Sequence, residues 1–215
     1  MLRNNIIVLD FETGGTDSKL HPITQVGLAV LEPKNLSIID QYEAFVKPYN
    51  DLEITKKALE VSRVTMEEIN GGIDHVKLIA KLIEIFRKHT PPNTRDARPI
   101  LVGHNFPFDM SFGKALFELK NKDLYDFIDP VYYCTMRMMK MIDRKVRKDE
   151  DYTLTSCCSR FGIKLKSAHG AMHDVMATSD LFKAIWNSIG TEESRKDKSE
   201  EVRGEQQKSR KFFEF

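Results

Sequence analysis

The sequence predicts one α/β domain, built on a mixed central β-sheet with helices on both of its faces. The first observation is a set of β-rich runs at 5–10, 23–32 and 36–47, of which the second and third are typical of an antiparallel meander. The second observation is that helical periodicity alternates with short apolar runs further along the chain. Strands in succession, followed by alternating helices and strands, are typical of a mixed sheet that is covered on both sides.

The later elements follow from the spacing of apolar residues. Residues 99–103 form a short apolar run that ends in glycine, which predicts a strand at 100–103. A second short strand is expected near 130–133. Helices are predicted, in chain order, at 53–60, 65–69, 74–89, 108–120, 135–143, 153–161 and 171–188. With 215 residues, of which 41% are hydrophobic, the chain suits a single globular core.

Acidic residues stand at the ends of three of these elements. Asp10 and Glu12 follow the apolar run 6–9, and side chains two apart on a strand point to the same face. Asp109 and Asp174 each fall in the first turn of a predicted helix, where the positive helix end favours a carboxylate. Taken alone, the first pair is equally consistent with a strand that ends in acidic turn residues. With the other two acids, a bound cation is the expected remedy for the mutual repulsion of the carboxylates.

Three sequence motifs carry these acids: DFETG at 10–14, HNFPFD at 104–109 and HGAMHD at 169–174. In this order they resemble the DnaQ-like family of 3′→5′ exonucleases, in the branch (DEDDh) that is defined by four acidic residues and a histidine. The resemblance covers roughly residues 4–189. The chain departs from the family pattern at Gln25, where many relatives carry an acid in the second strand.

The resemblance implies a ribonuclease-H-like fold and the hydrolysis of phosphodiester bonds with two divalent cations, Mg²⁺ or Mn²⁺. It implies that Asp10 bridges the cations, that Glu12 and Asp174 hold the cation beside the attacking water, and that Asp109 holds the other. His169 is the implied general base, because the pKa of imidazole lies near working pH; the alternative is a loop histidine without a role. Zinc is disfavoured, because the surroundings are rich in oxygen ligands and the HExxH signature is absent.

Four further residues are candidates for substrate binding. Thr13 and Gly14 follow the first acids, and glycine permits a close approach of the backbone to the terminal nucleotide. Phe108 could stack on the terminal base or sugar, or could equally be part of the core. Asn105 is a candidate too, although we prefer for it, or for Phe106, the role of capping the helix that begins at the following proline.

The charge of the chain limits how it can bind nucleic acid. The formal net charge is +1, which excludes a broad basic surface of the kind that wraps a duplex. Binding is therefore expected to be local and mediated by metal. The basic stretch 137–148 has two interpretations, a loop that follows phosphates or a solvated helix end, and the second is favoured.

The sulfur-containing residues predict an intracellular protein. Cys134, Cys157 and Cys158 are too few for a disulfide framework and lack zinc-ribbon spacing, so buried, reduced thiols in the cytoplasm are expected. The methionines within 136–141 are interpreted as adaptable filler of the core. The sequence has no secretory signal and no apolar stretch that approaches the roughly 20 residues needed to span a membrane.

Residues 191–215 differ in composition from the domain that is predicted over 1–190. Residues 191–210 carry charges of both signs and almost no apolar residues, which predicts a flexible linker. Phe212, Phe213 and Phe215 follow, and with Gln206 they loosely resemble the peptide that binds sliding clamps. We expect this segment to dock on a replication partner such as a sliding clamp or a polymerase. The alternative is that it folds back onto its own domain.

The predicted function is the removal of nucleotides from single-stranded or unpaired DNA 3′ ends, in proofreading or repair. The first alternative is a 3′→5′ exoribonuclease that trims short RNA, because no residue reveals whether a 2′-hydroxyl is tolerated. The second is a non-catalytic subunit that tethers a polymerase. It is disfavoured because all five acid and histidine positions of the family are present.

Overall fold

A computed structural model of the chain describes residues 4–90, 97–143, 151–165 and 170–190. Five strands form one mixed sheet in the spatial order β3-β2-β1-β4-β5. The strands are β1 (Ile6–Thr13), β2 (Ile23–Leu31), β3 (Ile38–Phe45), β4 (Ile100–Gly103) and β5 (Tyr133–Cys134). β1, β2 and β3 pair antiparallel, as the meander predicts, whereas β4 runs parallel to β1 and β5 runs parallel to β4.

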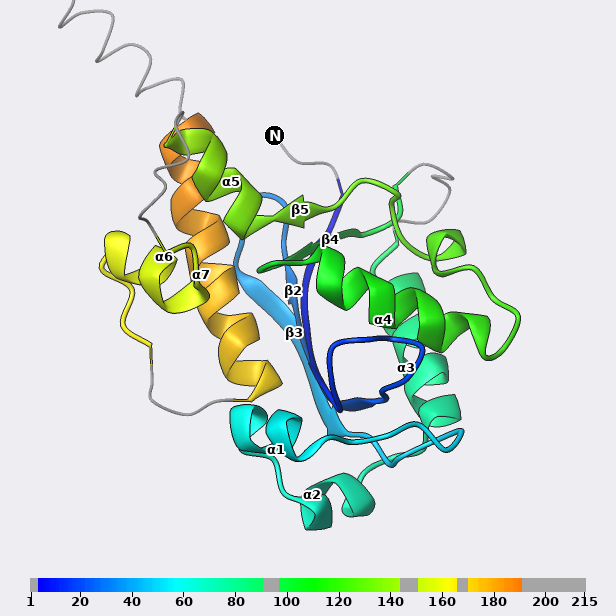
Figure 1. The fold of residues 1–215 in the computed structure, drawn as a ribbon. Helices are drawn as coiled ribbons and strands as arrows, with labels where there is room; N and C mark the ends of the chain where they lie inside the picture. Colours follow the sequence, from blue (N-terminus) through cyan, green and yellow to red (C-terminus); the bar gives the residue numbers. More distant parts are fainter. Residues whose placement is uncertain (1–3, 91–96, 144–150, 166–169, 191–215) are drawn as a thin grey trace, which may run out of the picture.

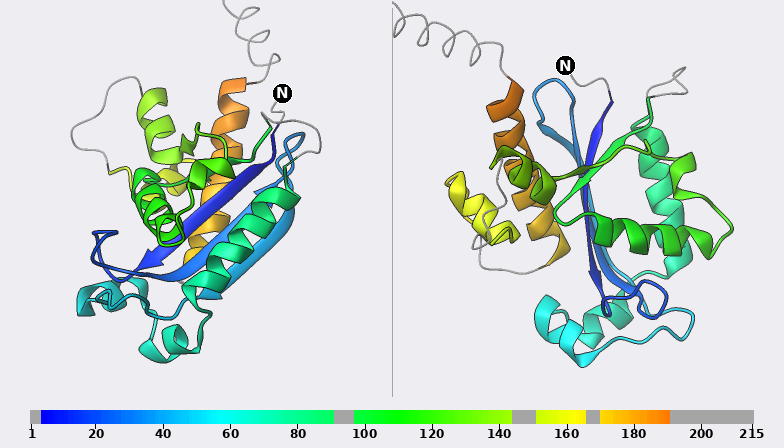
Figure 2. Two further views of the ribbon diagram at one scale, coloured as in Figure 1. Left: turned by 90° about the vertical axis from the view of Figure 1, so that its right-hand side faces the viewer. Right: turned by 45° about the horizontal axis from the view of Figure 1, so that its top comes forward.

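Helices cover both faces of the sheet (Figures 1 and 2). α3 and α4 lie on one face, α5, α6 and α7 lie on the other, and α1 and α2 lie beyond the end of β1 (Figure 1). The helices are α1 (Lys56–Ser62), α2 (Met66–Gly71), α3 (His75–Lys88), α4 (Pro107–Glu118), α5 (Thr135–Ile142), α6 (Leu154–Arg160) and α7 (Ala171–Gly190), with a short 3₁₀ helix, η1, at Leu124–Asp126. The prediction of a mixed sheet with helices on both faces is confirmed.

Alternation along β1 sends its side chains to two different cores. Ile7 and Leu9 pack with the apolar faces of α3 and α4, whereas Ile6 and Val8 pack with Val175 and Phe182 of α7. A third cluster joins α5, α6 and α7. Side chains two apart on a strand share a face. The side chains that follow Ile6 and Val8 at every second position of β1 therefore point toward the first turn of α7.

α7 lies close to the sheet because β2 has a glycine beneath its first turn. A Cβ atom placed on Gly27 would come within 2.6 Å of the carbonyl carbon of Ala171 and 2.7 Å of the backbone nitrogen of Met172. Gly27 pairs with Asp10 across β1 and β2. The glycine therefore lets the helix approach β1 at the level of that acid.

The structure corrects several sequence predictions. The strand expected at 130–133 is confined to Tyr133–Cys134. Of the four methionines within 136–141, which were expected to fill the core, Met139 is buried and Met136 and Met138 pack half-buried against the core clusters, whereas Met141 is 63% exposed beside a surface pocket. The three cysteines are buried free thiols, as predicted. None of the helices in the described part of the chain is long and apolar enough to cross a membrane.

Replacing Gly27 by alanine should destabilise the protein by about 1–3 kcal/mol, because the added methyl group overlaps backbone atoms that cannot rotate away. The measurement is urea unfolding followed by circular dichroism. Gly71→Ala is the matched control: a Cβ atom at Gly71 meets nothing within 4 Å, so this variant should be as stable as the wild type or slightly more stable. Equal stability of the two variants would contradict the close contact between β2 and α7.

Candidate metal centre

Three carboxylates from two elements converge beside the end of the sheet. Asp10 and Glu12 come from β1, and Asp174 comes from the first turn of α7. Each offers one oxygen to a group whose atoms all lie within 4.8 Å of one another. The sequence places these residues up to 164 positions apart, and the close approach of α7 to β2 brings them together.

Asp109 comes from α4, the helix on the opposite face of the sheet from α7 (Figure 1). It belongs to the first turn of α4, as predicted, and its side chain is only 3% exposed. Its Oδ1 accepts a hydrogen bond of 3.0 Å from the backbone N–H of Phe11, the residue between Asp10 and Glu12. The fourth acid is thus fixed to β1 at the residue between the two acids of the first pair.

Burial and the charges of neighbouring acids raise the pKa values of Asp10, Glu12 and Asp109. Burial raises the pKa of Asp10 well above its ordinary value, and the charges of Asp109, Asp174 and Glu12 raise it further. Burial, with a contribution from Asp174, raises the pKa of Glu12 to about 7. Burial also raises the pKa of Asp109 to about 7, although the hydrogen bond from Phe11 opposes this. No basic side chain in the described ranges forms an ion pair with Asp10, Glu12 or Asp109.

Gln25 of β2 holds the first turn of α7 in place. It pairs with Glu12 across the two strands and is 4% exposed. Its Oε1 accepts a hydrogen bond of 3.2 Å from the backbone N–H of Ala171, and its Nε2 donates one of 2.8 Å to Oε1 of Glu43. The amide therefore satisfies a donor at the start of the helix that carries Asp174, without adding a fifth negative charge to the cluster.

The residue before α7 is a glycine with an unusual backbone conformation. Gly170 has φ 147°, a value that side-chain-bearing residues rarely adopt. Its carbonyl accepts hydrogen bonds from the N–H groups of His173 (2.9 Å) and Asp174 (3.2 Å), which starts the helix. His169, the predicted general base, lies outside the described residues.

His104, the first residue of the second motif, has a structural role that the sequence did not reveal. Its Nε2 lies 2.8 Å from the carbonyl oxygen of Tyr152, and its Nδ1 lies 2.9 Å from Oγ1 of Thr135. Burial lowers its pKa, which favours the neutral ring, with Nε2 as donor and Nδ1 as acceptor. The imidazole links the end of β4 to the start of α5 and to the segment before α6.

Two of the predicted substrate contacts make hydrogen bonds within the protein. Oγ1 of Thr13 donates to the carbonyl of Gly15 at 2.7 Å. The N–H of Gly14 donates to the carbonyl of Pro22 at 2.8 Å, and its own carbonyl accepts from the backbone and side chain of Thr55. The turn after Glu12 is thereby tied to the start of α1.

The other two candidates lie at the start of α4. Phe108 is half-buried and packs against Phe112 with a distance of 5.0 Å between ring centroids. The preferred role of Asn105 as a cap is wrong: Phe106 occupies the N-cap position and provides no side-chain hydrogen bond. Asn105 is exposed and has φ 53°, so its contribution to the turn is the left-handed conformation that asparagine tolerates.

The donor set fits Mg²⁺ or Mn²⁺. All four acids offer carboxylate oxygens, which these cations prefer, and the three cysteines lie buried in other parts of the core. A cation here would offset the repulsion that raises the pKa values of Asp10, Glu12 and Asp109. The arrangement can therefore hold cations against a phosphate group at the surface where β1 and α7 meet.

Comparison with known sequences agrees with this chemistry. The sequence model of a family described as Exonuclease (RNase T) matches residues 7–182. The DNA polymerase III PolC-type of Ureaplasma parvum is 25% identical over 186 residues, which are 85% of this chain and 12% of that protein. The corresponding protein of Bacillus subtilis is 27% identical over 176 residues, which are 82% of this chain and 11% of that protein. The chain thus spans about one eighth of the length of these relatives.

Comparison with solved structures agrees with the fold. E. coli Exonuclease I in complex with a dT13 oligonucleotide has a TM-score of 0.71 at 20% identity, covering 86% of this chain and 41% of that one. The zinc-bound form of the complex of the same enzyme with single-stranded DNA has a TM-score of 0.72 at 19% identity, covering 87% and 41%. At this level of identity the similarity shows a shared fold.

Without divalent cations, the protein should lose stability as the pH rises from about 4 to about 7. The folded pKa values of Glu12 and Asp109 are about 7, so over this range the folded protein keeps protons that the unfolded chain releases. Thermal unfolding in a chelating buffer measures the effect, and added Mg²⁺ should raise Tm more at the upper end of the range than at the lower end. Glu12→Gln should reduce the slope; an unchanged slope would contradict the assignment.

Gln25→Leu should weaken the binding of Mn²⁺ about tenfold, because loss of the bond to Ala171 releases the helix turn that carries Asp174. Isothermal titration calorimetry measures the affinity. Glu43→Gln is the control: it preserves an acceptor for the Nε2 of Gln25 and should bind Mn²⁺ like the wild type. Wild-type affinity in Gln25→Leu would show that the amide does not position the acid.

Proposed function

Because the chain belongs to the DnaQ-like exonuclease family, whose sequence model (RNase T) matches residues 7–182, we propose that it is a metal-dependent 3′→5′ exonuclease that acts on single-stranded or unpaired DNA 3′ ends. The observation that carries this proposal is the convergence of Asp10, Glu12 and Asp174, with Asp109 held against the same strand. A buried cluster of acids favours a bound cation, and divalent cations are the catalysts of phosphodiester hydrolysis in two-metal sites.

The acids would hold two divalent cations, Mg²⁺ or Mn²⁺, with Asp10 as the shared ligand. Glu12 and Asp174 would complete one position, and Asp109 would serve the other. When bound, the cations supply positive charge that favours deprotonation of the attacking water and stabilises the leaving 3′-oxygen. His169 is proposed to take the proton from that water, since imidazole titrates near neutral pH.

Two groups are proposed to hold the terminal nucleotide. Thr13 and Gly14 form the turn that leaves β1 beside the acids, and the hydrogen bonds of this turn to Gly15, Pro22 and Thr55 hold its backbone rigid. Phe108 and Asn105 stand at the start of α4, where Phe108 is half-buried and Asn105 is exposed. A phenyl ring can stack on any base, so this site would bind the 3′ end without reading sequence.

The proposal of DNA as substrate draws on the relatives. The Ureaplasma parvum relative is a DNA polymerase III of the PolC type, and E. coli Exonuclease I has been solved in complex with a dT13 oligonucleotide. From the sequence, residues 1–190 are predicted to form the exonuclease domain and residues 191–215 a charged tail, and the protein is predicted to work in the reducing cytoplasm. The predicted docking of Phe212, Phe213 and Phe215 on a clamp or polymerase concerns residues outside the described ranges.

Asp10→Ala should reduce nucleotide release in the presence of Mg²⁺ or Mn²⁺ at least about a hundredfold, because it removes the shared ligand. The substrates are matched DNA and RNA oligonucleotides labelled at the 5′ end, and gel analysis of the shortened products gives the rate and the direction. The fold should remain intact, since the substitution also removes a repelling charge.

Asp180→Asn is the matched control, because Asp180 is an exposed acid on the same helix as Asp174 and should leave the rate unchanged. Shortening of RNA but not DNA would favour the exoribonuclease alternative. Absence of any nucleotide release by the wild type with Mg²⁺, Mn²⁺ or Zn²⁺ would favour the non-catalytic binding subunit. Cutting of circular single strands would indicate an endonuclease.

A further inference from the structure

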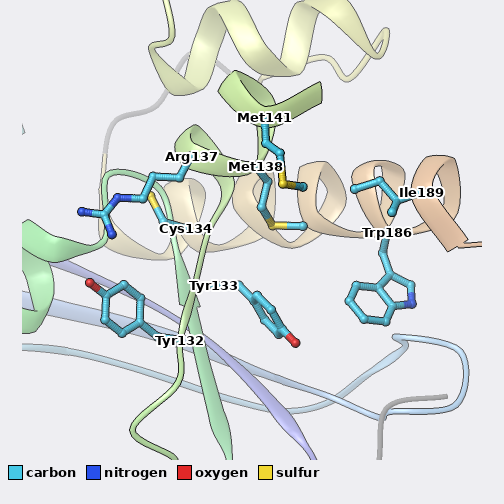
Figure 3. A pocket seen from close by; sticks show the side chains of 8 residues that line it. All are labelled: Tyr132, Tyr133, Cys134, Arg137, Met138, Met141, Trp186 and Ile189. Atoms are coloured by element: carbon cyan, nitrogen blue, oxygen red, sulfur yellow. The ribbon is translucent and has the colours of Figure 1, made fainter. Parts of the chain in front are cut away.

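An apolar pocket lies far from the acids, between α5, α7 and the edge strand β5. Figure 3 shows its walls: Met138 and Met141 from α5, Trp186 and Ile189 from α7, and Tyr133 from β5. Tyr132, Cys134 and Arg137 complete the lining. We call this site the α5–α7 pocket. Its volume is about 430 Å³, within the range of pockets that receive small ligands.

The floor of the α5–α7 pocket is preformed. The Tyr133 ring lies 5.8 Å from the Phe182 ring and 6.1 Å from the Trp186 ring, measured between centroids, and Phe182 is fully buried. The rim, by contrast, is exposed: Met141 is 63% and Ile189 is 44% accessible to solvent. A rigid aromatic floor with exposed aliphatic walls is an unfavourable surface to leave in water.

The pocket does not belong to the metal centre. Trp186 follows Asp174 by twelve residues on one continuous helix, which places the two about 18 Å apart at 1.5 Å per residue. The lining also does not suit a strand of nucleic acid, which needs a row of cationic groups beside its aromatic platforms. Arg137 is the single charged residue among the lining residues. An apolar peptide that carries a carboxylate fits this surface better.

The chain itself contains such a peptide. The segment 211–215 reads Lys-Phe-Phe-Glu-Phe, which combines three aromatic anchors with one acid. We propose that this segment docks into the α5–α7 pocket of its own chain, with phenylalanine rings against Trp186 and the methionines and with Glu214 opposite Arg137. The inference goes beyond the proposed nuclease activity and does not depend on it.

The length of the connection favours docking within one chain. α7 ends at Gly190, directly after pocket residue Ile189, and residues 191–210 separate it from the aromatic segment. A coil of twenty residues has an average reach of about 25 Å, and short tethers give effective concentrations in the millimolar range. A segment with only weak affinity for the pocket would therefore occupy it.

Arg137 is the positive charge in the pocket with which Glu214 of the docked segment would pair. Arg137 forms no ion pair with a carboxylate of the described residues, whereas Arg160 on α6 is paired with Asp143. In Figure 3 the Arg137 side chain extends at the Tyr132 end of the pocket. Methionine walls adapt to the shape of an inserted ring, which suits a peptide anchored by phenylalanine.

Trp186 makes the proposal directly testable, because it is the single tryptophan of the chain. Deletion of residues 206–215 should shift the Trp186 emission to longer wavelength and increase its quenching by acrylamide, as water replaces the docked rings. Addition of the peptide 206–215 to the shortened chain should reverse both changes. The full chain with all three phenylalanines replaced by serine should behave like the deletion.

Two matched variants locate the contact. Met141→Glu in the full chain should reproduce the deletion, whereas Val61→Glu, at an equally exposed position on α1, should not. Arg137→Glu should weaken binding of the peptide to the shortened chain about threefold, and Glu214→Lys in the peptide should restore it. Both measurements are made on protein without substrate or metal.

Unchanged emission and quenching after the deletion would overturn the proposal, and would leave the aromatic segment available to another protein. Emission that depends on protein concentration would also overturn it, because it would identify a second copy of the chain as the source of the occupant. Emission that is independent of concentration and reversed by the peptide would support docking within one chain.

Discussion

The site depends on the repulsion among four carboxylates that the fold forces together. Burial and mutual charge raise the pKa values of Asp10, Glu12 and Asp109, and no described basic side chain pairs with any of the three. The fold tolerates this cluster because apolar side chains pack on both faces of β1. Their packing stabilises the folded state, which the repulsion among the acids destabilises. The same repulsion favours a bound cation at the cluster, so the instability of the site and its proposed chemistry have one cause.

The geometry of the cluster is set by the contact between β2 and α7. Gly27 allows the helix to approach, and Gln25 accepts the hydrogen bond from Ala171 that fixes its first turn. Each of these residues pairs with an acid of β1 across the two strands. An acid in place of Gln25 would keep the acceptor but would add a charge beside Glu12 and Glu43, so the neutral amide suits this particular cluster.

Most strands and helices follow from local patterns in the sequence, whereas roles that rest on hydrogen bonds to distant residues were not predicted. The strand at 100–103 was predicted with its observed bounds because proline and glycine enclose a short apolar run, and the place of Asp109 followed from Pro107. The roles of Gln25 and His104 were not predicted, because their hydrogen-bond partners lie 146, 31 and 48 residues away. Of the two residues predicted to cap α4, Phe106 occupies the N-cap position without a side-chain hydrogen bond, whereas the preferred Asn105 precedes it in a left-handed conformation.

α7 carries the last acid at its first turn and the wall of the α5–α7 pocket at its end. Between the two, Val175, Leu181, Phe182 and Ile185 are buried against the sheet and the neighbouring helices. A close-packed helix does not slide by fractions of a turn, because every side chain would have to leave its place at once. Occupation of the pocket is therefore expected to leave the position of Asp174 unchanged. The effect of the aromatic segment would be to cover an apolar surface, while the chemistry at the other end of the helix proceeds independently.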